Sequence, residues 1–317
     1  MSHAYFKPLK DAISKDCNIR EWTIETNPFI PLKKSSPSHS DLFQIYSNEG
    51  VHRITLGAQS LNPKVLKFLG RHHSPKDILQ SLKSATDAQI SQIQVDIIYG
   101  HPLEESPDSL RTTIQTLKNN GATGVSLYAL TPEMNTHYSN LILDEDKAAR
   151  EYEILGEECI QQGFIPWEAS NFTTQPCLHN FNYWKNRPYI GLGTGACGFT
   201  PTNKHYRVGP PLSGGNAKLH DFTEEELFTV HWESSLTSEE QSQERLLTQI
   251  RLWEGITLNR LQMNSLKEDP RIREALNQGL MNTKEIASDK LNLRLYWKEQ
   301  IRHLSWVNVI NHKLKNI

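Results

Sequence analysis

The chain has 317 residues, and its 34 basic and 36 acidic side chains nearly cancel to a formal net charge of −2. A balanced surface of this kind offers no attractive field to a polyanion, so nucleic acid is disfavoured as a partner. No apolar run approaches the length of a membrane span, and residues 1–6 lack the layout of a signal peptide. We therefore expect a soluble, cytoplasmic protein with no membrane span.

The first half of the chain alternates strand and helix patterns with little padding. The expected elements are a helix near residues 5–16, a strand over 22–28, a helix over 41–50, a strand over 51–57, a helix from Ser74-Pro75, a strand over 94–102, a helix over 108–119 and a strand over 123–130. Each strand-helix unit takes roughly 30 to 35 residues. Strands in such repeats run parallel with helical crossovers, which predicts an α/β barrel or a doubly wound sheet.

Polar residues fall at the ends of the expected strands. Asp96 lies inside the apolar run 95–99, where an unpaired carboxylate would cost on the order of several kcal/mol to bury. Glu25, Gln59 and Thr131 lie at or just past the ends of three other strands. Because ligands bind at this rim of parallel α/β folds, the set predicts a ligand site. For each residue alone, the alternative is a structural role, such as a carboxylate that caps a loop.

The pattern changes after residue 144. We expect a charged helix over 144–162, a strand over 164–169 and an irregular aromatic segment over 171–188. The Gly-rich run 189–198 matches the spacing of a dinucleotide fingerprint, but no helix-forming sequence follows it. Its glycines are therefore expected to let the backbone approach a flat ligand or a neighbouring strand.

The predicted fold class is α/β: an incomplete barrel of parallel strands, followed by a small α-rich C-terminal domain. The predicted boundaries place the barrel with its aromatic and Gly-rich extension at 1–208, a linker at 209–236 and the C-terminal domain at 237–317. The cysteines, which are Cys17, Cys159, Cys177 and Cys197, form no Cys-x-x-Cys pair. Neither a disulfide framework nor a closed zinc site is predicted.

Several motifs resemble, in order and spacing, the radical S-adenosylmethionine (SAM) family of oxygen-independent coproporphyrinogen III oxidases. These motifs are Thr23-Ile-Glu-Thr-Asn-Pro28, Arg53-Ile-Thr-Leu-Gly-Ala-Gln-Ser60 with Leu69-Gly-Arg-His72, Val95-Asp-Ile-Ile-Tyr-Gly100 and Ser126-Leu-Tyr128. In addition, His179-Asn-Phe-Asn-Tyr-Trp184 matches the His-Asn-x-x-Tyr-Trp motif of the heme chaperone branch, HemW, which the oxidase branch lacks. The resemblance implies a radical-SAM-type (β/α) barrel.

The resemblance also implies two sets of binding residues. The SAM contacts fall on Glu25, Gln59, Arg71, Asp96 and Thr131, and the heme contacts fall on His179, Asn180, Tyr183 and Trp184. Carboxylates accept hydrogen bonds from hydroxyls or an ammonium, a guanidinium can grip a carboxylate, and an imidazole can bind heme iron. Cys177, His72 and His205 are further candidate ligands of the iron. The alternatives stay open: a surface arginine, a glutamine that ties a loop, and an aromatic segment that is purely structural.

The sequence departs from the family at its beginning. The family's Cys-x-x-x-Cys-x-x-Cys loop, which holds a [4Fe-4S] cluster, and its Gly-Gly-Gly-Thr-Pro strand end are absent, so no catalytic or metal-binding residue is predicted. We expect a truncated N-terminus relative to the family, as a shortened paralogue, one half of a split protein or a different start codon. We also expect that this chain alone assembles no cluster and cleaves no SAM.

Three functions remain open on these grounds. The first is a HemW-like heme-binding chaperone or heme trafficking protein. The others are a radical SAM enzyme of the coproporphyrinogen oxidase type that is completed by a missing N-terminal segment, and a non-catalytic remnant. Heme or porphyrin is the expected ligand. Because two strand-helix units are absent, we also expect an open barrel edge at which the chain pairs with a protein partner or with another copy.

Overall fold

The computed structural model describes residues 6–28, 39–209 apart from 133, 135 and 137, and then residues 223, 225, 226, 229–287, 290–295 and 310. Its internal contacts divide the chain into two units. The first unit contains Met1–Thr131 and Ile142–Pro176, and the second contains Pro132–Leu141 and Cys177–Ile317. The boundaries predicted at residues 208 and 236 stay predictions.

The first unit is built on a six-stranded sheet with the order β1-β2-β3-β4-β6-β5. The strands are β1 (Thr23–Thr26), β2 (Arg53–Gln59), β3 (Gln92–Tyr99), β4 (Gly124–Ala129), β5 (Ile165–Glu168) and β6 (Asn171–Thr173). Strands β1 to β4 pair in parallel, as the repeated strand-helix pattern predicts, while β6 runs antiparallel to β4 and to β5. Among the described strands, β1 has only β2 as a neighbour.

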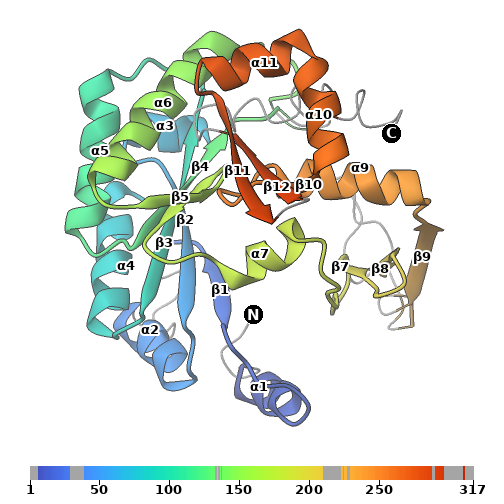
Figure 1. The fold of residues 1–317 in the computed structure, drawn as a ribbon. Helices are drawn as coiled ribbons and strands as arrows, with labels where there is room; N and C mark the ends of the chain where they lie inside the picture. Colours follow the sequence, from blue (N-terminus) through green and yellow to red (C-terminus); the bar gives the residue numbers. More distant parts are fainter. Residues whose placement is uncertain are drawn as a thin grey trace. The chain divides into compact units, whose positions relative to one another are not determined.

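Helices cover one face of this sheet (Figure 1). The helices of the unit are α1 (Phe6–Ser14), α2 (His39–Asn48), α3 (Pro63–Phe68), α4 (Pro75–Asp87), α5 (Pro107–Asn119) and α6 (Glu145–Gln161), of which α2, α4, α5 and α6 lie along the covered face. Ser74 and Ser106 cap α4 and α5 through side-chain hydrogen bonds, each followed by proline at the first helical position. Such caps are worth about 1 kcal/mol each. Because serine and proline are preferred at these two positions, the sequence predicts both helix starts.

The two faces of the sheet differ in polarity. Successive side chains of a strand point to opposite faces. Ile93, Val95 and Ile97 of β3 are buried on the face that the helices cover. Tyr99 extends this apolar face, with its ring 5.7 Å from that of Tyr152 in α6. The opposite face carries polar side chains, and we call it the inner face: Arg53 of β2, Gln94 and Asp96 of β3, and Ser126 of β4.

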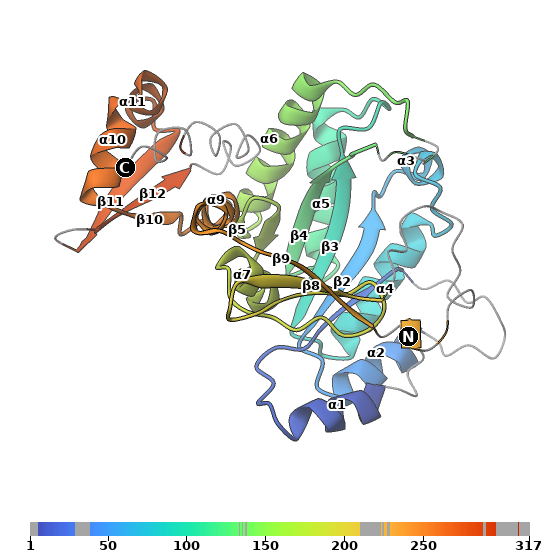
Figure 2. The same ribbon diagram turned by 90° about the vertical axis from the view of Figure 1, so that its right-hand side faces the viewer.

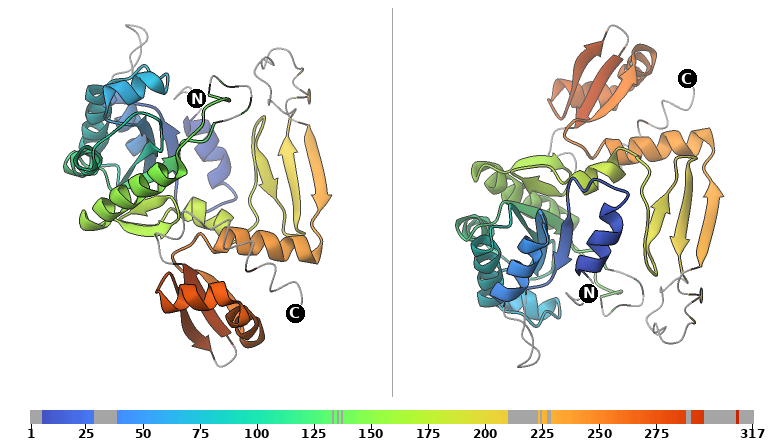
Figure 3. Two further views of the ribbon diagram at one scale, coloured as in Figure 1. Left: turned by 90° about the horizontal axis from the view of Figure 1, so that it is seen from above. Right: turned by 90° about the horizontal axis from the view of Figure 1, so that it is seen from below.

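The second unit begins with a short helix and a three-stranded antiparallel sheet. Its elements are α7 (Leu178–Trp184), β7 (Cys197–Phe199), β8 (Lys204–Val208), β9 (Val230–Ser235) and α9 (Ser238–Gln249). Helix α9 crosses one end of the β7-β8-β9 sheet (Figure 3).

Two expectations are corrected in this part of the chain. The segment 171–188 is not irregular, because β6 and α7 lie within it, and the linker predicted at 209–236 contains β9. In both cases the elements are short and their regular structure depends on neighbours distant in sequence, which a local pattern does not reveal. The rest of that linker, over 210–222, lies outside the described residues.

The glycines of the run 189–198 do allow close backbone approach. A side chain at Gly191 would collide with the backbone of Cys197, and one at Gly198 would collide with the ring of Tyr206. Both neighbours are protein groups of the same unit. For these two glycines, the structure therefore supports close approach to a neighbouring strand, which was one of the two expectations, the other being a flat ligand.

The end of the chain is a small mixed lobe rather than a helical one. Its elements are β10 (Ile256–Asn259), α10 (Arg260–Glu268), α11 (Pro270–Asn277), β11 (Met281–Ala287) and β12 (Lys290–Leu295), and its sheet has the order β10-β12-β11. Both helices lie on one side of this sheet (Figure 2). Met263, Leu266, Ile272, Leu293 and Leu295 are among its fully buried residues. The three strands were not predicted, because their exposed faces are strongly polar. Among the described residues, no helix is both long and apolar enough to cross a bilayer.

Candidate functional site

The inner face of the first unit holds a carboxylate with an unused hydrogen-bonding atom. Asp96 lies opposite Ser126 in the β3-β4 register, and the two side chains are hydrogen-bonded. The second carboxylate oxygen, Oδ1, is buried and has no hydrogen-bond partner among the described residues. Buried polar atoms in folded proteins are nearly always paired, so an orphaned oxygen indicates a missing donor such as a ligand hydroxyl or ammonium.

The electrostatic surroundings of Asp96 are negative. Burial raises the pKa of Asp96 to about 6, the hydrogen bond with Ser126 lowers it, and the nearby Glu25 carboxylate raises it. Burial, together with the charge on Asp96, also raises the pKa of Tyr128 to about 12, so Tyr128 stays protonated. Two carboxylates and a phenol therefore gather at one place, and they suit a ligand that carries positive charge or hydroxyl donors.

The other predicted SAM residues are only partly gathered there. Glu25 is exposed on β1 and acts electrostatically on Asp96. Gln59 ends β2 with a positive φ of 71° and is 8% exposed, and its amide lies beside Gly57 and Asn27. This left-handed backbone is uncommon for a residue with a side chain and is typical of functional loops.

Arg71 and Thr131 stand apart from this group. Arg71 is exposed after α3 and lines a separate cavity of about 320 Å³ with Lys67 and His72. The hydroxyl of Thr131 donates to the carbonyl of Ala129 at 3.3 Å. No hydrogen bond or ion pair joins either residue to Asp96 within the described ranges, so their assignment to a SAM site stays a prediction.

The cysteines do not fit the [4Fe-4S] cluster that the family implies. Cys17 and Cys197 are exposed, whereas Cys159 is buried in α6 and Cys177 is buried at the start of α7. Burial, followed by the charge on Glu158, raises the pKa of Cys159, which disfavours the thiolate needed for iron. In the part of the chain that the structure describes, no three His, Cys, Asp or Glu side chains are grouped so as to hold a metal ion.

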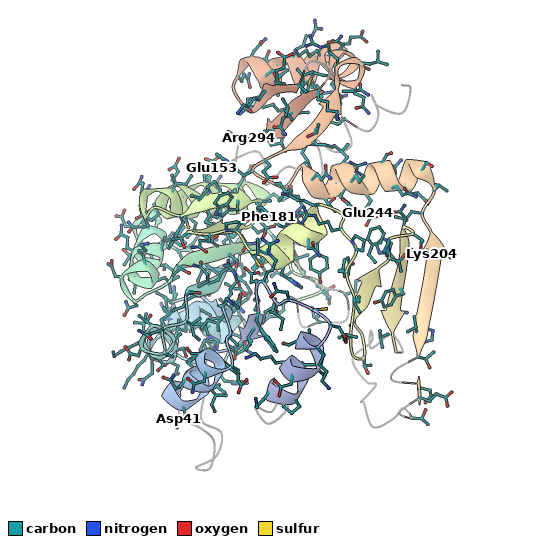
Figure 4. All side chains as sticks on the ribbon, turned by 60° about the horizontal axis from the view of Figure 1, so that its bottom comes forward. Asp41, Glu153, Phe181, Lys204, Glu244 and Arg294 are labelled. Atoms are coloured by element: carbon teal, nitrogen blue, oxygen red, sulfur yellow. The ribbon has the colours of Figure 1, made fainter. Side chains whose placement is uncertain are left out.

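The second unit contains a continuous series of aromatic rings that we call the aromatic row. Its members, in order, are His179, Tyr183, Tyr189, Phe199 and His205, with ring centroids 4.8, 4.3, 6.3 and 4.7 Å apart. His179 is exposed at one end, and at the other end His205 lies 3.2 Å from Oε1 of Glu244. Figure 4 labels Phe181 on α7, Glu244 on α9 and Lys204 at the start of β8.

The helical period divides the predicted heme residues between two sides of α7. His179 and Tyr183 are four residues apart and belong to the aromatic row, whereas Asn180 and Trp184 are displaced by one position and lie on an adjacent side. The guanidinium of Arg251, just past α9, lies 4.5 Å above the Trp184 ring. A cation over an indole is a favourable contact, and it covers one ring face of Trp184. Trp184 therefore packs α7 against α9.

Several residues of these two places were given no role from the sequence. Ser126 and Tyr128 were recognised only as part of the motif Ser126-Leu-Tyr128, and the polar alternation of β4 could have marked them as residues of the rim. Tyr189 and Phe199 join the aromatic row only through the pairing of β7 with its neighbours, for which the local sequence gives no signal.

Comparisons with known proteins agree with this fold. A model of the radical SAM superfamily matches residues 2–117. The heme chaperone HemW of Bacillus subtilis is 26% identical over 82% of this chain and 69% of its own length. HemW of Escherichia coli is 32% identical over 56% of this chain and 46% of its own length. A bovine mitochondrial radical S-adenosyl methionine domain-containing protein 1 is also 32% identical, over 62% of this chain and 43% of its own length.

The solved structure of coproporphyrinogen III oxidase (HemN) from Escherichia coli, a radical SAM enzyme, has a similar fold. It superposes with a TM-score of 0.69 and 14% identity, covering 98% of this chain and 75% of that one. The chain spans between 43% and 69% of the lengths of the three relatives named above.

The parallel sheet with its polar rim has the fold of the radical SAM enzyme HemN, and a radical SAM superfamily model matches residues 2–117. In sequence, the chain is similar to the HemW heme chaperones of Bacillus subtilis and Escherichia coli.

Proposed function

We propose that this chain is a HemW-like heme-binding protein that holds heme against the His179 side of α7. The observation that carries the proposal is the aromatic row, in which an exposed imidazole stands at the end of five adjacent rings. A neutral imidazole can bind iron while tyrosine and phenylalanine rings cover an apolar macrocycle. The names of the HemW relatives support heme as the ligand.

Within this proposal, the residues of the motif have different tasks. His179 and Tyr183 contact the heme, and Trp184 anchors the helix that presents them. When bound, heme supplies its iron and a flat apolar surface. His179 would supply a nitrogen ligand to the iron, α7 would orient that imidazole, and the Tyr183 ring would keep water from part of the macrocycle.

The test is a heme titration followed at the Soret band. His179→Ala is expected to weaken heme binding about tenfold or more, since the imidazole that would bind the iron is lost and each factor of ten is about 1.4 kcal/mol. His231→Ala is a matched control, because His231 is an exposed histidine on β9, outside the aromatic row. Circular dichroism verifies that each variant folds. Native affinity in a folded His179→Ala would remove the main support for the proposal.

Two further variants identify the ligand set. Cys177→Ala is expected to leave heme affinity within about twofold, because the Cys177 side chain is buried at the helix start. His205→Ala tests the far end of the row. If heme affinity falls in His205→Ala but stays native in His179→Ala, the ligand of the iron would be His205 on β8 instead of His179.

The rim around Asp96 supports a second part of the proposal, which is the binding of SAM or a similar adenosyl compound. Asp96 and Glu25 would accept hydrogen bonds from ribose hydroxyls or the ammonium of the ligand. Calorimetric titration with SAM is expected to show binding that Asp96→Ala abolishes and that Thr112→Ala, an exposed change on α5, preserves. If the native protein and Asp96→Ala bind SAM equally well, the rim around Asp96 is not the SAM site.

A radical SAM enzyme of the coproporphyrinogen oxidase type is the second candidate. The orphaned Asp96 oxygen supports SAM binding, and therefore favours this enzyme as much as it favours a SAM-binding heme chaperone. The four cysteines do not fit a cluster, so we expect no stoichiometric charge-transfer absorption after anaerobic reconstitution with iron and sulfide. We also expect no 5′-deoxyadenosine from SAM. Appearance of both signals from this chain alone would contradict the expectation and make the enzyme the better candidate.

A further inference from the structure

A buried arginine links several polar groups of the inner face. Arg53, at the start of β2, is 1% exposed. Its Nη1 donates to Oε1 of Gln94 at 3.1 Å, and its Nη2 donates to the backbone carbonyls of Gln175 and Pro176 at 3.1 and 3.0 Å. The Glu21 carboxylate lies 3.6 Å from its Nε and balances the charge. A buried guanidinium with this many partners is costly to place and indicates a specific task.

The arginine sets the direction of the hydrogen bonds that follow. Because a guanidinium only donates, the Gln94 side chain must present its oxygen to Arg53 and its NH₂ group to the other side. That NH₂ group donates to Oγ of Ser126 at 2.6 Å and also to Oδ1 of Asn171. The Ser126 oxygen is thus an acceptor, and its own proton is available for the next group.

The next group is the carboxylate of the candidate SAM rim. Ser126 is hydrogen-bonded to Asp96 and also lies within reach of Tyr128. The carboxylate is the stronger acceptor of the two, so the Ser126 hydroxyl donates to Asp96. An ordered chain of donors therefore runs from Arg53 through Gln94 and Ser126 to Asp96, and it leaves Oδ1 of Asp96 for a ligand.

The same guanidinium holds the backbone ahead of the candidate heme segment. Gln175 and Pro176 immediately precede Cys177, and α7 with His179 begins one residue later. Two hydrogen bonds from one buried group restrict the carbonyl orientation at both positions and therefore limit how the chain leaves the sheet.

We propose that Arg53 is a positioning residue shared by both candidate sites, which orients the Gln94-Ser126 pair toward Asp96 and fixes the backbone from which the His179 helix begins. This inference rests on the proposed function for the identity of the two ligands. The hydrogen-bond chain to Asp96 is independent of that function and can be tested without a ligand.

The charged and titratable groups facing Asp96 define the measurement. Tyr128 lies on the adjacent strand β4 and Glu25 on β1, which is separated from β3 by β2, and Glu168 acts on Tyr128. Burial raises the pKa of Asp96 to about 6, and Ser126 holds it lower than burial alone would. Loss of any member of the hydrogen-bond chain is therefore expected to raise that pKa further.

The experiment compares three variants of the full chain by two readouts. The variants are Ser126→Ala, Gln94→Leu and Arg53→Met, and Arg111→Met on the outer helix α5 is the control. Carboxyl-carbon NMR gives the pKa of Asp96, and a heme titration gives the affinity at α7. All three variants are expected to raise the pKa of Asp96 by about one unit. Only Arg53→Met is expected to weaken heme binding as well, by about tenfold.

Each branch of the proposal can fail separately. An unchanged Asp96 titration in folded Ser126→Ala and Gln94→Leu overturns the hydrogen-bond chain. Native heme affinity in Arg53→Met overturns the backbone role. If Arg53→Met does not fold, Arg53→Lys keeps the charge beside Glu21 but cannot reach Gln94 and both carbonyls together, so it must show the same two changes. A native chain that binds no heme defeats the proposed function, while the NMR readout still decides the first branch.

Discussion

Asp96, a candidate binding residue, lowers the stability of the fold that carries it. The carboxyl has a pKa of 3.8 in the unfolded chain and about 6 in the folded one, chiefly because of burial. Between these values the folded state binds more protons than the unfolded state, so the free energy of unfolding falls as the pH rises from about 4 to about 6. At neutral pH the full loss of stability that comes from burying the ionised Asp96 carboxylate is present.

Asp96→Asn is therefore expected to stabilise the protein. The free energy of unfolding should rise by about 1 to 3 kcal/mol at pH 7.5, and the difference should vanish below pH 4. Urea denaturation at the two pH values measures it, with Glu25→Gln as an exposed control that changes stability little. A variant less stable than the native chain at pH 7.5 would show that Asp96 is satisfied in the unliganded protein. SAM binding should be lost in the same variant.

Individual residues were predictable from sequence to different degrees. Asp96 was recognised because a carboxylate in an apolar strand is anomalous, and Glu25 because it lies at the end of an expected strand. Glu25 is near enough to act electrostatically on Asp96. The packing of Trp184 could not be predicted, because its contact with Arg251, just past α9, joins residues 67 positions apart in the sequence. A motif identifies which side chains matter, while the partner of each is decided by packing.

At the scale of elements, a buried ionic cluster fixes the loop between β3 and α5. The Lys147 ammonium contacts Oε1 of Glu151 at 2.7 Å and donates to the carbonyls of His101 and Leu103 at 2.6 and 3.1 Å. The other oxygen of Glu151 accepts from the Gly100 amide at 2.7 Å. Gly100 has a φ of 74° and no room for a side chain beside Ala148. Helix α6 thus holds the loop that follows the Asp96 strand.

Lys147→Met is expected to lower the free energy of unfolding by about 3 to 5 kcal/mol, because the Glu151 carboxylate would remain buried without its counter-ion. The side chains of this pair are only 12% and 6% exposed. Lys83→Met is the matched control, since its ion pair with Asp87 is 74% and 60% exposed and should change stability by less than about 1 kcal/mol. Guanidinium denaturation measures both. Similar small changes in the two variants would contradict a structural role for the cluster.

Which elements the sequence predicts follows from how local their signals are. The starts of α4 and α5 are encoded by a serine, a proline and an amphipathic period within a few residues of one another. Strands β6, β9 and β10 to β12 are three to seven residues long and are fixed by pairing across the chain. The parallel half of the fold was therefore predictable, whereas the sheets of the second unit were not.

At the scale of the whole molecule, the free edge of β1 predicts self-association. Among the described strands only β2 pairs with β1, and a parallel edge leaves backbone donors and acceptors open to another chain. Sedimentation velocity over a range of concentrations should show reversible association. Thr26→Lys on β1 should weaken it, and Thr112→Lys on α5 should not. A chain that stays monomeric at high concentration counts against the prediction.

The contacts of Arg53 also have a consequence during synthesis. Its two backbone acceptors lie 122 and 123 residues further along the chain, so β2 leaves the ribosome long before they exist. At about 5 to 20 residues per second, Nη2 of Arg53 waits roughly 6 to 25 seconds for both of its acceptors, while Glu21 already balances the charge. The parallel strands can form early, but their final closure depends on the arrival of Pro176. Nascent chains that stop short of that residue are therefore the forms most in need of a folding chaperone.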